Sequence, residues 1–331
     1  MSRVLVTGGG GYVGSALVPR LLERGHQVRV VDLFWYGREV FGGALRHPAL
    51  ELAEVDIRDT ARVKPLLAGV DTVIHLACIS NDPSFELDPE LGKSINYDAF
   101  QSLVDGAVEH GVRRFIYASS SSVYGIKEVP NVTEDAAPEP LTDYSRFKLL
   151  CEHDLLAHPN PGGMTRVVAR PATVCGYAPR LRLDLTVNIL TIHALVNRRI
   201  RVFGGSQLRP NLHVADMVRG YECLMDAPAH LIDGQAFNIG FENRSVADIA
   251  ALVRSTLGDA GVEIETTPSD DLRSYHINAD KVRDVLGFVP CHTIADAIRS
   301  IADAYRAGAI PDPLTRLAYY NLKTMKALQV A

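Results

Sequence analysis

The sequence predicts an α/β fold, in which a doubly wound parallel sheet is followed by a smaller α/β lobe. Short runs rich in β-branched residues alternate with helical patterns through the first half of the chain. Strands separated by helices in this way form a parallel sheet that helices cover on both faces. The alternation weakens after residue 176, and 331 residues are many for a single core, so a second lobe is expected.

The expected strands of the main sheet are short segments rich in β-branched and aromatic residues. They cover residues 3–8, 27–32, 50–56, 71–77, 114–120 and 165–172. The segments between them carry helical patterns. These helices cover residues 13–24, 59–67, 94–110 and 144–157. A sheet of this kind receives its ligands at the carboxyl edge of the strands.

The smaller lobe is expected to contain strands at 200–205 and 235–240 and helices at 246–258 and 294–308. We place the domain boundary at residue 175. Residues 1–175 then form the sheet domain and residues 176–331 the lobe that receives a ligand, with a return of the chain to the first domain around 210–240. The tail from residue 314 has a helical apolar pattern and is expected to pack on the smaller lobe.

The composition excludes several classes of protein. The chain is 47% hydrophobic and 22% charged, which is typical of a soluble globular protein, and no apolar run is long enough to cross a membrane. A net charge of −5 without a cluster of Lys and Arg argues against nucleic acid as a partner. The five cysteines form no CxxC pair and the eleven histidines no HxxxH pair. We therefore expect reduced thiols, a cytoplasmic protein and no metal site.

The first strand ends in a glycine-rich turn that opens a helix. Gly8, Gly11 and Gly14 have the spacing GxxGxxG, so that the backbone can approach a pyrophosphate at the helix N-terminus. Asp32 ends the second strand, where its carboxylate can accept hydrogen bonds from both ribose hydroxyls and would repel a 2′-phosphate. The sequence therefore predicts a Rossmann-type domain that binds NAD in preference to NADP.

Other residues at the same sheet edge complete the expected cofactor site. Asp56 and Ile57 follow the third strand and could touch the adenine. "HLA" at 75–77 ends the fourth strand beside the expected pyrophosphate. A histidine at a strand end is more often hydrogen-bonded to the backbone than catalytic, and we expect this of His75. The full expected set of cofactor contacts is Gly8, Gly11, Tyr12, Val13, Gly14, Asp32, Asp56, Ile57, Leu76, Ala77, Asn96, Tyr144 and Lys148.

A phenol and an ammonium share one face of the helix at 144–157. Tyr144 and Lys148 are four residues apart, and Ser120 ends the fifth strand at the carboxyl edge. A free tyrosine, with a pKa near ~10, is a poor base at neutral pH, but a neighbouring ammonium favours the phenolate. Tyr144 could then accept a proton from a substrate hydroxyl while Ser120 hydrogen-bonds the same oxygen.

In its motifs the chain resembles an extended short-chain dehydrogenase/reductase of the nucleotide-sugar epimerase/dehydratase group. The motifs fall in that family's order across nearly the whole chain: "TGGGGYVG", "DIRD", "HLA", "SINYDAF", "SSSSVYG", "YSRFK", "RPATVCG", "LRPNLHVAD" and "DKVRDVLGFVP". The resemblance implies that Ser120, Tyr144 and Lys148 carry catalysis and that Asn96 supports the active-site helix. It also implies that Asn188 and Arg209 hold the diphosphate of a sugar nucleotide.

The expected substrate contacts are Ser120, Ser121, Thr173, Asn188, Arg209 and Arg273. The family's 4,6-dehydratases carry Asp-Glu after the active-site hydroxyl and its decarboxylases a glutamate, whereas this chain has Ser121 and Ser122. Elimination and decarboxylation are therefore disfavoured. Thr173 and Cys175 also depart from the common "NVYGP" motif, which leaves the identity of the substrate open.

Three functional hypotheses follow. The first is a nucleotide-sugar 4-epimerase that keeps its NAD and works through a transient 4-keto sugar. The alternative is a 4-dehydrogenase or 4-ketoreductase, because "APRLRLDLTVNILT" and "DLRSYHINADK" resemble a branch that acts on bacterial surface-polysaccharide precursors, including a GDP-heptose 4-dehydrogenase. The third is an inactive NAD-binding sensor, which the intact Tyr144 and Lys148 disfavour.

A homodimer is also expected. The helices at 94–110 and 144–157 each carry a second set of bulky apolar residues, which includes Phe100, Leu103, Phe147 and Leu155. In the family that the chain resembles, these two helices form a four-helix contact between subunits.

Overall fold

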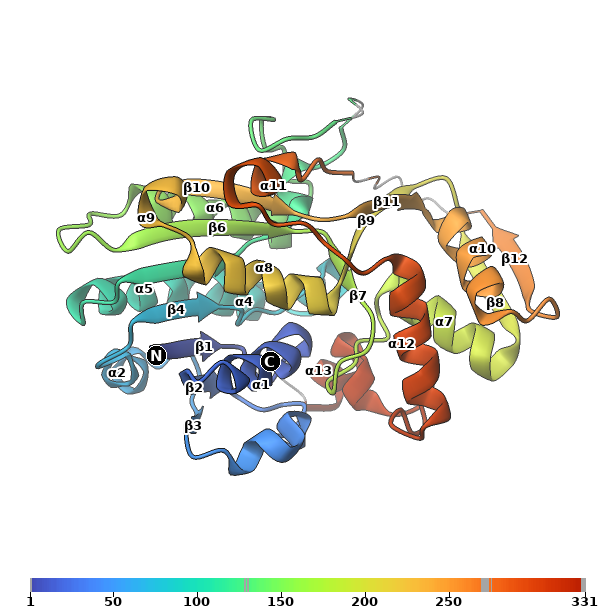
Figure 1. Cartoon of the computed structure of the whole chain (residues 1–331), viewed down its shortest axis with the longest axis horizontal. Coiled ribbons are helices and arrows are strands. Elements are labelled where there is room, and N and C mark those ends of the chain that lie inside the picture. The colour runs from blue at the N-terminus through green and yellow to red at the C-terminus, as the bar shows by residue number, and fades with distance from the viewer. Residues whose placement is uncertain (1, 128, 130, 269–273, 275, 329–331) are drawn as a thin grey trace.

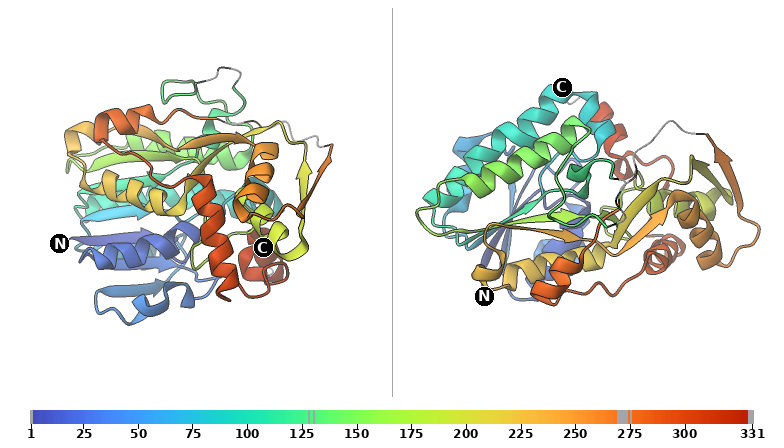
Figure 2. Two further views of the ribbon diagram at one scale, coloured as in Figure 1. Left: turned by 45° about the vertical axis from the view of Figure 1, so that its right-hand side comes forward. Right: turned by 90° about the horizontal axis from the view of Figure 1, so that it is seen from above.

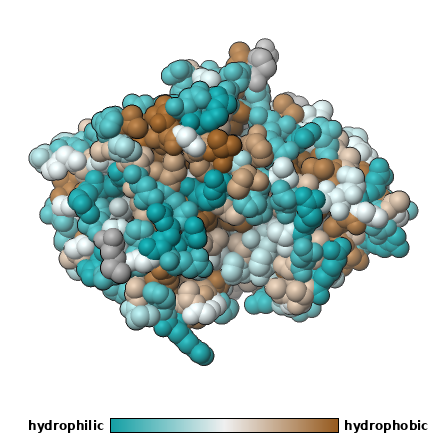
Figure 3. All heavy atoms as spheres, in the orientation of Figure 1, coloured by the Kyte–Doolittle hydropathy of each residue, from teal (hydrophilic) through white to brown (hydrophobic). Residues whose placement is uncertain are grey.

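The protein is described by a computed structural model that covers residues 2–127, 129, 131–268, 274 and 276–328. A wide parallel sheet with helices on both faces forms the larger part, and a smaller α/β lobe adjoins the carboxyl ends of its strands (Figure 1). Polar residues cover most of the face drawn in Figure 3, with apolar residues in smaller patches. This distribution is ordinary for a folded domain whose largest apolar side chains are inside.

The main sheet has seven strands in the order β10-β6-β5-β4-β1-β2-β3, and every neighbouring pair is parallel. The strands are β1 (Arg3–Thr7), β2 (Gln27–Asp32), β3 (Leu50–Glu54), β4 (Thr72–His75), β5 (Arg114–Ala118), β6 (Thr165–Pro171) and β10 (Gln235–Ile239). All six strands predicted for the first half are present, with their ends within three residues of the expected ones.

Helices on the two faces of the sheet bury alternate residues of each strand. In β1, Val4 and Val6 pack into one layer and Leu5 into the other, and all three are fully buried. The first layer contains α1 (Tyr12–Glu23) and α8 (Val214–Asp226), and the second contains α5 (Ala99–Glu109) and α6 (Asp143–Ala157). Figure 2, seen from above, shows these helices on opposite sides of the sheet.

Short helical segments connect these larger elements. They are η1 (Glu39–Arg46), α2 (Thr60–Val63), η2 (Lys64–Leu67), α3 (Asp82–Leu87), α4 (Pro89–Lys93), the π-helical η3 (Ser94–Asp98), η4 (Ser121–Tyr124), α9 (Ala229–Ile232), α11 (Asp280–Leu286) and η5 (Leu317–Tyr319). The helix expected at 94–110 is therefore divided into η3 and α5, and the helix expected at 59–67 into α2 and η2.

The smaller lobe contains three helices and two small sheets. The helices α7 (Thr186–Asn197), α10 (Val246–Leu257) and α12 (Ile294–Arg306) pack on one another around an apolar core. The first sheet contains β7 (Thr173–Cys175), β9 (Leu208–His213) and β11 (Glu242–Ser245), and the second pairs β8 (Arg199–Phe203) with β12 (Glu263–Thr267). The sequence patterns at 200–205, 246–258 and 294–308 gave β8, α10 and α12.

The chain crosses between the two parts more than once. After β9 it returns as α8, which packs on α1, and continues as β10 at the edge of the main sheet. After β12 it returns again as α11, beside β10, before α12 rejoins the lobe. Residues 235–240 are thus part of the main sheet, within the stretch 210–240 where a return to the first domain was expected, because the apolar Phe237 and Ile239 complete its first layer.

Hydrogen bonds hold the segment before α12 against α8. The buried Asp216 accepts hydrogen bonds from the backbone N–H groups of Cys291 and His292, at 3.0 and 2.7 Å. The side-chain atoms of these three residues that could bind a metal ion lie within 4.8 Å of one another. However, the Asp216 carboxylate already forms an ion pair with Arg219, at 2.6 Å. We therefore assign the group to holding the segment in place.

The C-terminal segment packs on both parts of the protein. The helix α13 (Asn321–Leu328) contacts α3, and Met325 is buried in the second layer of the sheet domain together with Phe85. The expectation that this tail packs on the smaller lobe holds for Leu314, Tyr319 and Tyr320, which share an apolar cluster with Ile192 of α7 and Ile301 of α12, and it is wrong for α13. The apolar face of α13 covers the sheet domain at the edge where the strands end.

The apolar residues expected at a dimer contact are used inside the chain. Phe100, Leu103 and Leu155 are at most 2% exposed in the second layer. Phe147 is half-buried and its ring stacks on those of Phe85 and Tyr97. The prediction that Phe100, Leu103 and Leu155 face a partner is therefore wrong, because the second layer of the sheet domain buries them.

Two further features concern the chain as a whole. Among the described helices, none combines the length and the apolar character that crossing a bilayer requires. The five cysteines are unpaired: Cys151 and Cys175 are buried, Cys78 and Cys223 are half-buried, and Cys291 is exposed.

Candidate active site

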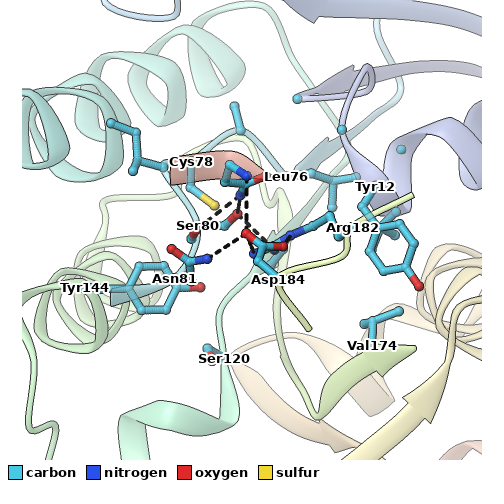
Figure 4. A pocket seen from close by; sticks show the side chains of 18 of the residues that line it. Tyr12, Leu76, Cys78, Ser80, Asn81, Ser120, Tyr144, Val174, Arg182 and Asp184 are labelled. Carbon is cyan, nitrogen blue, oxygen red and sulfur yellow. Dashed lines mark hydrogen bonds and ion pairs between the residues drawn. The ribbon is translucent and has the colours of Figure 1, made fainter. Parts of the chain in front are cut away.

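A cavity of about 770 Å³ lies where the carboxyl edge of the main sheet meets the smaller lobe. Its wall is formed by the turn after β1, the ends of β2 to β5, the start of α6, the segment around β7, and α13. Figure 4 shows side chains from these elements converging on one space. A ligand in this cavity would touch both the sheet domain and the smaller lobe.

The glycine-rich turn brings the backbone close to the ligand space. Gly8 has a φ of +71°, and a Cβ at this position would lie 2.5 Å from the backbone nitrogen of Ala77. A Cβ on Gly14 would lie 2.4 Å from the carbonyl oxygen of Gly9. No side chain caps the N-terminus of α1 at Gly11 in the described structure, so its N–H groups remain available to an anion.

Asp32 closes this turn from the end of β2. Its carboxylate accepts hydrogen bonds from the backbone N–H groups of Gly10, at 2.9 Å, and Phe34, at 2.7 Å. Burial raises the pKa of Asp32, although these backbone donors oppose the effect. The carboxylate is thereby fixed in the cavity wall, at the position expected for ribose recognition.

The remaining expected cofactor residues of strands β3 and β4 also line the cavity: Asp56, Ile57, Leu76 and Ala77. Burial disfavours the Asp56 carboxylate, but the hydrogen bonds and charge of Arg58 outweigh this effect and lower its pKa. His75 lies behind the wall. It is 2% exposed, bonds the Thr7 hydroxyl at 2.6 Å, and burial lowers its pKa to about 3.

The three predicted catalytic residues meet on the opposite side of the cavity. Ser120, Tyr144 and Lys148 all line it. A capping box, in which the Thr142 hydroxyl and the Ser145 side chain satisfy each other's backbone N–H groups, starts α6 just before Tyr144. The Lys148 Nζ lies 5.9 Å from the Tyr144 ring centroid and donates to the Ala118 carbonyl at 2.7 Å.

The electrostatics of Tyr144 differ from the prediction. Burial raises the pKa of the phenol, and Cys78 and Asp82 act in the same direction. Arg182 and a hydrogen bond with Ser120 oppose this shift. Lys148, which was expected to lower this pKa, is not among the groups with the largest effects on it, and burial outweighs the groups that lower it.

A buried ion pair lies behind the catalytic residues and links the elements that carry them. Glu152, one turn after Lys148 on α6, forms an ion pair with Arg170 of β6 at 2.6 Å, and both side chains are less than 10% exposed. The Ser119 hydroxyl donates to Glu152, and Arg170 donates to the Tyr124 hydroxyl at 2.9 Å. The network thus ties α6 to the strand end that carries Ser120, and it was missed in the sequence because Glu152 reads as a surface residue.

Two expected ligand contacts lie outside the cavity wall. The side-chain amide of Asn96 accepts from the Ile79 N–H and donates to the Ile79 carbonyl. The backbone carbonyl of Asn96 accepts from the Cys151 thiol of α6. Asn188 is fully buried and bonds the Gly176 N–H, the Arg182 carbonyl and the Tyr12 hydroxyl. We therefore correct the expected contacts: these two amides support loops.

Most of the other expected residues do line the cavity: Tyr12, Val13, Ser121, Thr173 and Arg209. The Tyr12 hydroxyl donates to the Gly176 carbonyl at 2.5 Å, so its ring rather than its hydroxyl faces the cavity. Arg273, the last expected substrate contact, lies outside the described residues.

A polar cluster in the cavity was not expected from the sequence. Arg182 pairs with Asp184 at 2.9 Å and donates to the Ser80 hydroxyl at 3.1 Å (Figure 4). Asn81 also donates to Asp184, at 3.0 Å. Arg180 enters the same cavity from the segment before Arg182. The alternating "RLRLD" at 180–184, directly after β7, was the signal that could have identified this cluster.

The comparisons with known proteins agree with the shape and the motifs of this site. The model of a family described as "NAD dependent epimerase/dehydratase family" matches residues 4–240. An uncharacterised UDP-glucose epimerase of Bacillus subtilis is 30% identical over 309 residues, which are 89% of this chain and 95% of the relative. The dTDP-glucose 4,6-dehydratase of Streptomyces griseus is 30% identical over 316 residues, or 92% and 94% of the two chains.

Two solved structures have nearly the same architecture. The UDP-glucose 4-epimerase of Thermotoga maritima, solved with UDP-glucose, has a TM-score of 0.83 at 25% identity. The UDP-glucuronic acid 4-epimerase of Bacillus cereus, solved with UDP-glucuronic acid and NAD, has a TM-score of 0.82 at 26% identity. Each similarity covers 92% of this chain and 99% of the other. Because both epimerases and a dehydratase are similar, these likenesses leave the reaction itself open.

Proposed function

Because the chain belongs to the NAD-dependent epimerase/dehydratase family, we propose that it is a nucleotide-sugar 4-epimerase. It is an NAD-dependent enzyme of the extended short-chain dehydrogenase/reductase type that modifies a nucleotide sugar. The proposal concerns the reaction, which inverts C4 of the sugar through a transient 4-keto sugar, and not the base or the sugar.

The residues present fit the cofactor. The glycine-rich turn leaves backbone space and free N–H groups at the α1 N-terminus for a diphosphate, and Asp32 stands where a carboxylate selects an unphosphorylated ribose. Bound NAD supplies a reversible hydride acceptor. Tyr144 and Lys148, on the other side of the cavity, would flank its nicotinamide end.

The catalytic roles follow from the side chains. Tyr144 accepts the proton of the C4 hydroxyl as the alcohol becomes a ketone, and returns it when the ketone is reduced. Because the Ser120 oxygen accepts from the Ser122 hydroxyl at 2.9 Å, the Ser120 proton can be donated to the Tyr144 oxygen or, when a sugar is bound, to the substrate oxygen. Arg209 lines the cavity and supplies a cation for the sugar-nucleotide diphosphate.

One observation favours epimerisation over elimination. Ser121 is 6% exposed and Ser122 bonds Ser120, so neither offers an acid or base for a second proton transfer at C5 or C6. Of the carboxylates in the cavity outside the cofactor part, Asp184 is paired with Arg182 and Asp82 accepts from the Thr142 hydroxyl at 2.7 Å. A site with one acid–base group fits a reaction that only opens and closes a carbonyl at C4.

The fate of a label at C4 tests the proposal. UDP-, GDP-, CDP- and dTDP-sugars are first screened for binding, and a bound sugar is then prepared with deuterium at C4. Because the hydrogen stays within the enzyme in an epimerase, NMR should find the label still on C4 of a product that differs only in configuration. The NADH absorbance at 340 nm should not grow.

Two other outcomes would reject the proposal. Loss of the label to added NAD or to a keto co-substrate would support net 4-oxidation or 4-reduction, for example of a GDP-heptose. Solvent deuterium at C5 in the product would show an elimination chemistry that the two serines are expected to prevent.

The pH profile should respond to Asp82. Since the Asp82 carboxylate raises the pKa of Tyr144, kcat/KM should increase with pH as the phenol ionises, and Asp82→Asn should move that increase to lower pH. We expect a shift of about half to one pH unit, which is about 3- to 10-fold in kcat/KM at a fixed pH on the rising limb. The asparagine can still accept from Thr142.

Glu90→Gln, an exposed change on α4, is the matched control and should leave the profile in place. An Asp82→Asn profile that is unmoved, or moved to higher pH, would exclude Tyr144 as the titrating base.

The assembly and the location remain proposals of their own. We propose a homodimer that forms through α5 and α6. The exposed Leu150 of α6 supports it, in place of the buried residues first expected. A molecular mass in solution equal to that of one chain would reject it. A cytoplasmic location follows from the proposed use of nucleotide sugars, and cell fractionation tests it.

A further inference from the structure

Tyr221 of α8 carries a polar group that the catalytic roles above leave unused. Its side chain lines the cavity and is only 2% exposed. Its hydroxyl forms no hydrogen bond with the described residues. The described polar atoms that lack a partner and are completely covered include two nitrogens of Arg180 but not this hydroxyl, so the hydroxyl retains access to the cavity. A hydroxyl removed from water is costly until a partner satisfies it.

Other buried phenols near the cavity have protein partners. The Tyr12 hydroxyl donates to the Gly176 carbonyl at 2.5 Å, and the Tyr124 hydroxyl donates to the side-chain oxygen of Asn238 at 2.7 Å. Phenols that only support the fold are thus satisfied within it. The unused hydroxyl of Tyr221 in the cavity wall therefore indicates a ligand contact.

The direction of α8 turns the Tyr221 ring toward the carboxyl edge of the sheet. The C-terminal end of α8 lies at the start of β5, because Arg114 donates to the Leu224 carbonyl at 2.7 Å. α8 therefore runs antiparallel to β5. Since helical side chains lean toward the N-terminus of their helix, Tyr221 leans toward the strand ends. It shares the first layer with Val123 and Ala172, which follow β5 and β6.

Cys78, which follows β4, lies near two phenols that come from opposite layers. Burial raises the pKa of Tyr144, on α6, and of Tyr221, on α8, and Cys78 acts in the same direction on both. All three residues line the cavity. The two hydroxyls therefore approach the same end of it, which is the end where Tyr144 and Lys148 would flank the nicotinamide in the proposed function.

The Tyr221 hydroxyl remains protonated at neutral pH. Burial raises its pKa well above the ordinary value, and Cys78 adds to this shift. Arg182 and Ser120, which oppose the effect of burial at Tyr144, have no such part at Tyr221. Tyr221 is therefore a neutral hydrogen-bond donor and not a second base. Its best partner in a ligand is a neutral acceptor such as an amide carbonyl.

We propose that Tyr221 donates a hydrogen bond to the carboxamide oxygen of the nicotinamide, and thereby fixes which face of the ring is turned toward the sugar. The carboxamide stands on one side of the ring, so a donor held by α8 selects one orientation over the one that is rotated by half a turn. In an epimerase the same face takes the hydride and returns it. An orientation that persists through both half-reactions keeps the hydride within reach of the 4-keto sugar.

The location of Tyr221 favours the cofactor over the sugar. α8 belongs to the first layer together with α1, whose N-terminus lies at the glycine-rich turn. The expected sugar-nucleotide contacts Thr173 and Arg209 come instead from β7 and β9 of the smaller lobe. The assignment rests on the proposed function, because that function places the nicotinamide beside Tyr144.

The test titrates the cofactor-free protein with NAD, with ADP-ribose, which lacks the nicotinamide, and with the NAD analogue that carries an acetyl group in place of the carboxamide. Tyr221→Phe removes the hydroxyl and keeps the ring. It should weaken NAD binding by about 3- to 10-fold, because one neutral hydrogen bond is lost. The acetyl analogue keeps the carbonyl oxygen and should lose as much. The affinity for ADP-ribose should change by less than about twofold.

Tyr319→Phe is the matched control, because it removes a buried phenol that lies outside the cavity wall. It should leave all three affinities within about twofold. The thermal midpoint checks folding. Removal of a hydroxyl without a partner should leave the cofactor-free Tyr221→Phe protein at least as stable as the unchanged protein, whereas the gain in midpoint from added NAD should shrink.

Turnover provides a second readout. At saturating NAD and sugar, kcat of Tyr221→Phe should fall by about 3-fold or more, because part of the bound cofactor then turns the wrong face of its ring to the sugar. The KM for the sugar should change by less than about twofold, since the hydroxyl does not contact the substrate.

Several results would overturn the assignment. Unchanged NAD affinity in the folded variant would remove Tyr221 from the cofactor site, and an equal loss for NAD and ADP-ribose would show that the hydroxyl does not act on the nicotinamide. A loss for NAD without a loss for the acetyl analogue would exclude donation to the carbonyl oxygen. An unchanged kcat would exclude the selection of a face, and a change confined to the KM for the sugar would place the contact on the substrate. The titrations need no sugar, so they can fail while the C4 label still supports the epimerase, and the label can reject the epimerase while the titrations stand.

Discussion

Tyr144→Phe should lower turnover by about 100-fold or more while cofactor binding persists. The phenylalanine keeps the ring in the cavity wall but removes the only group on α6 that is placed to accept the proton of a substrate hydroxyl, among the described residues. Because Lys148 is held by the Ala118 carbonyl and not by the phenol, the ammonium should stay in place. The measurement is kcat under saturating substrate, with the affinity for NAD determined separately.

The control for this change is Tyr305→Phe on α12, which removes a phenol of the smaller lobe remote from the catalytic residues. It should leave kcat within about twofold of the unchanged enzyme. A Tyr144→Phe enzyme with nearly normal turnover would show that another group takes the proton. Loss of NAD binding in the same variant would show that the change acts through the cofactor site.

The parts of the fold that follow from local pattern could be predicted from the sequence. Val4, Leu5 and Val6 form a continuous apolar run because β1 is buried on both faces, and the glycines after it are required by the close approach of Ala77 and Gly9. Ser120, Tyr144 and Lys148 converge because strand ends and helix starts of a parallel sheet meet at one edge. These relations need no information on distant contacts.

The parts that were missed depend on contacts between distant segments. The sequence predicted a return of the chain to the first domain around 210–240 but not the pairing of β10 with β6, and it placed the tail on the smaller lobe, whereas Met325 of α13 meets Phe85 in the sheet domain. Arg180 is an ordinary surface residue by composition. Only the folded chain shows that Tyr36 and Asn321 enclose it beside α1.

The effect of burial on the pKa of Tyr144 could not be predicted from the sequence for a related reason. The helical spacing of Tyr144 and Lys148 correctly predicted that they are neighbours, and the ammonium lies 5.9 Å from the ring centroid. It could not give the burial of the phenol, which raises its pKa, or the charge of Asp82 from α3. Spacing along one helix determines neighbours on that helix, whereas desolvation depends on what other segments cover.

Breaking the buried ion pair beneath the site should have the largest effect on stability. Glu152→Gln leaves the Arg170 guanidinium, whose side chain is 8% exposed, without its counter-charge. Removal of one partner of a buried pair costs about 3–5 kcal/mol of unfolding free energy, because the remaining charge is uncompensated. Glu109→Gln, which breaks the solvent-exposed pair with Lys64, is the matched control and should cost less than about 1 kcal/mol.

The double variant distinguishes a lost pair from a simple loss of packing. Glu152→Gln combined with Arg170→Met removes both charges, so its cost should be clearly smaller than the sum of the two single costs when all are measured by urea unfolding. Since Glu152 also accepts from Ser119, next to the catalytic Ser120, the single variant should lower kcat even under conditions where it stays folded. Additive costs, or a Glu152→Gln protein as stable as the Glu109→Gln control, would mean that the network beneath the site does not hold α6 against the strand that carries Ser120.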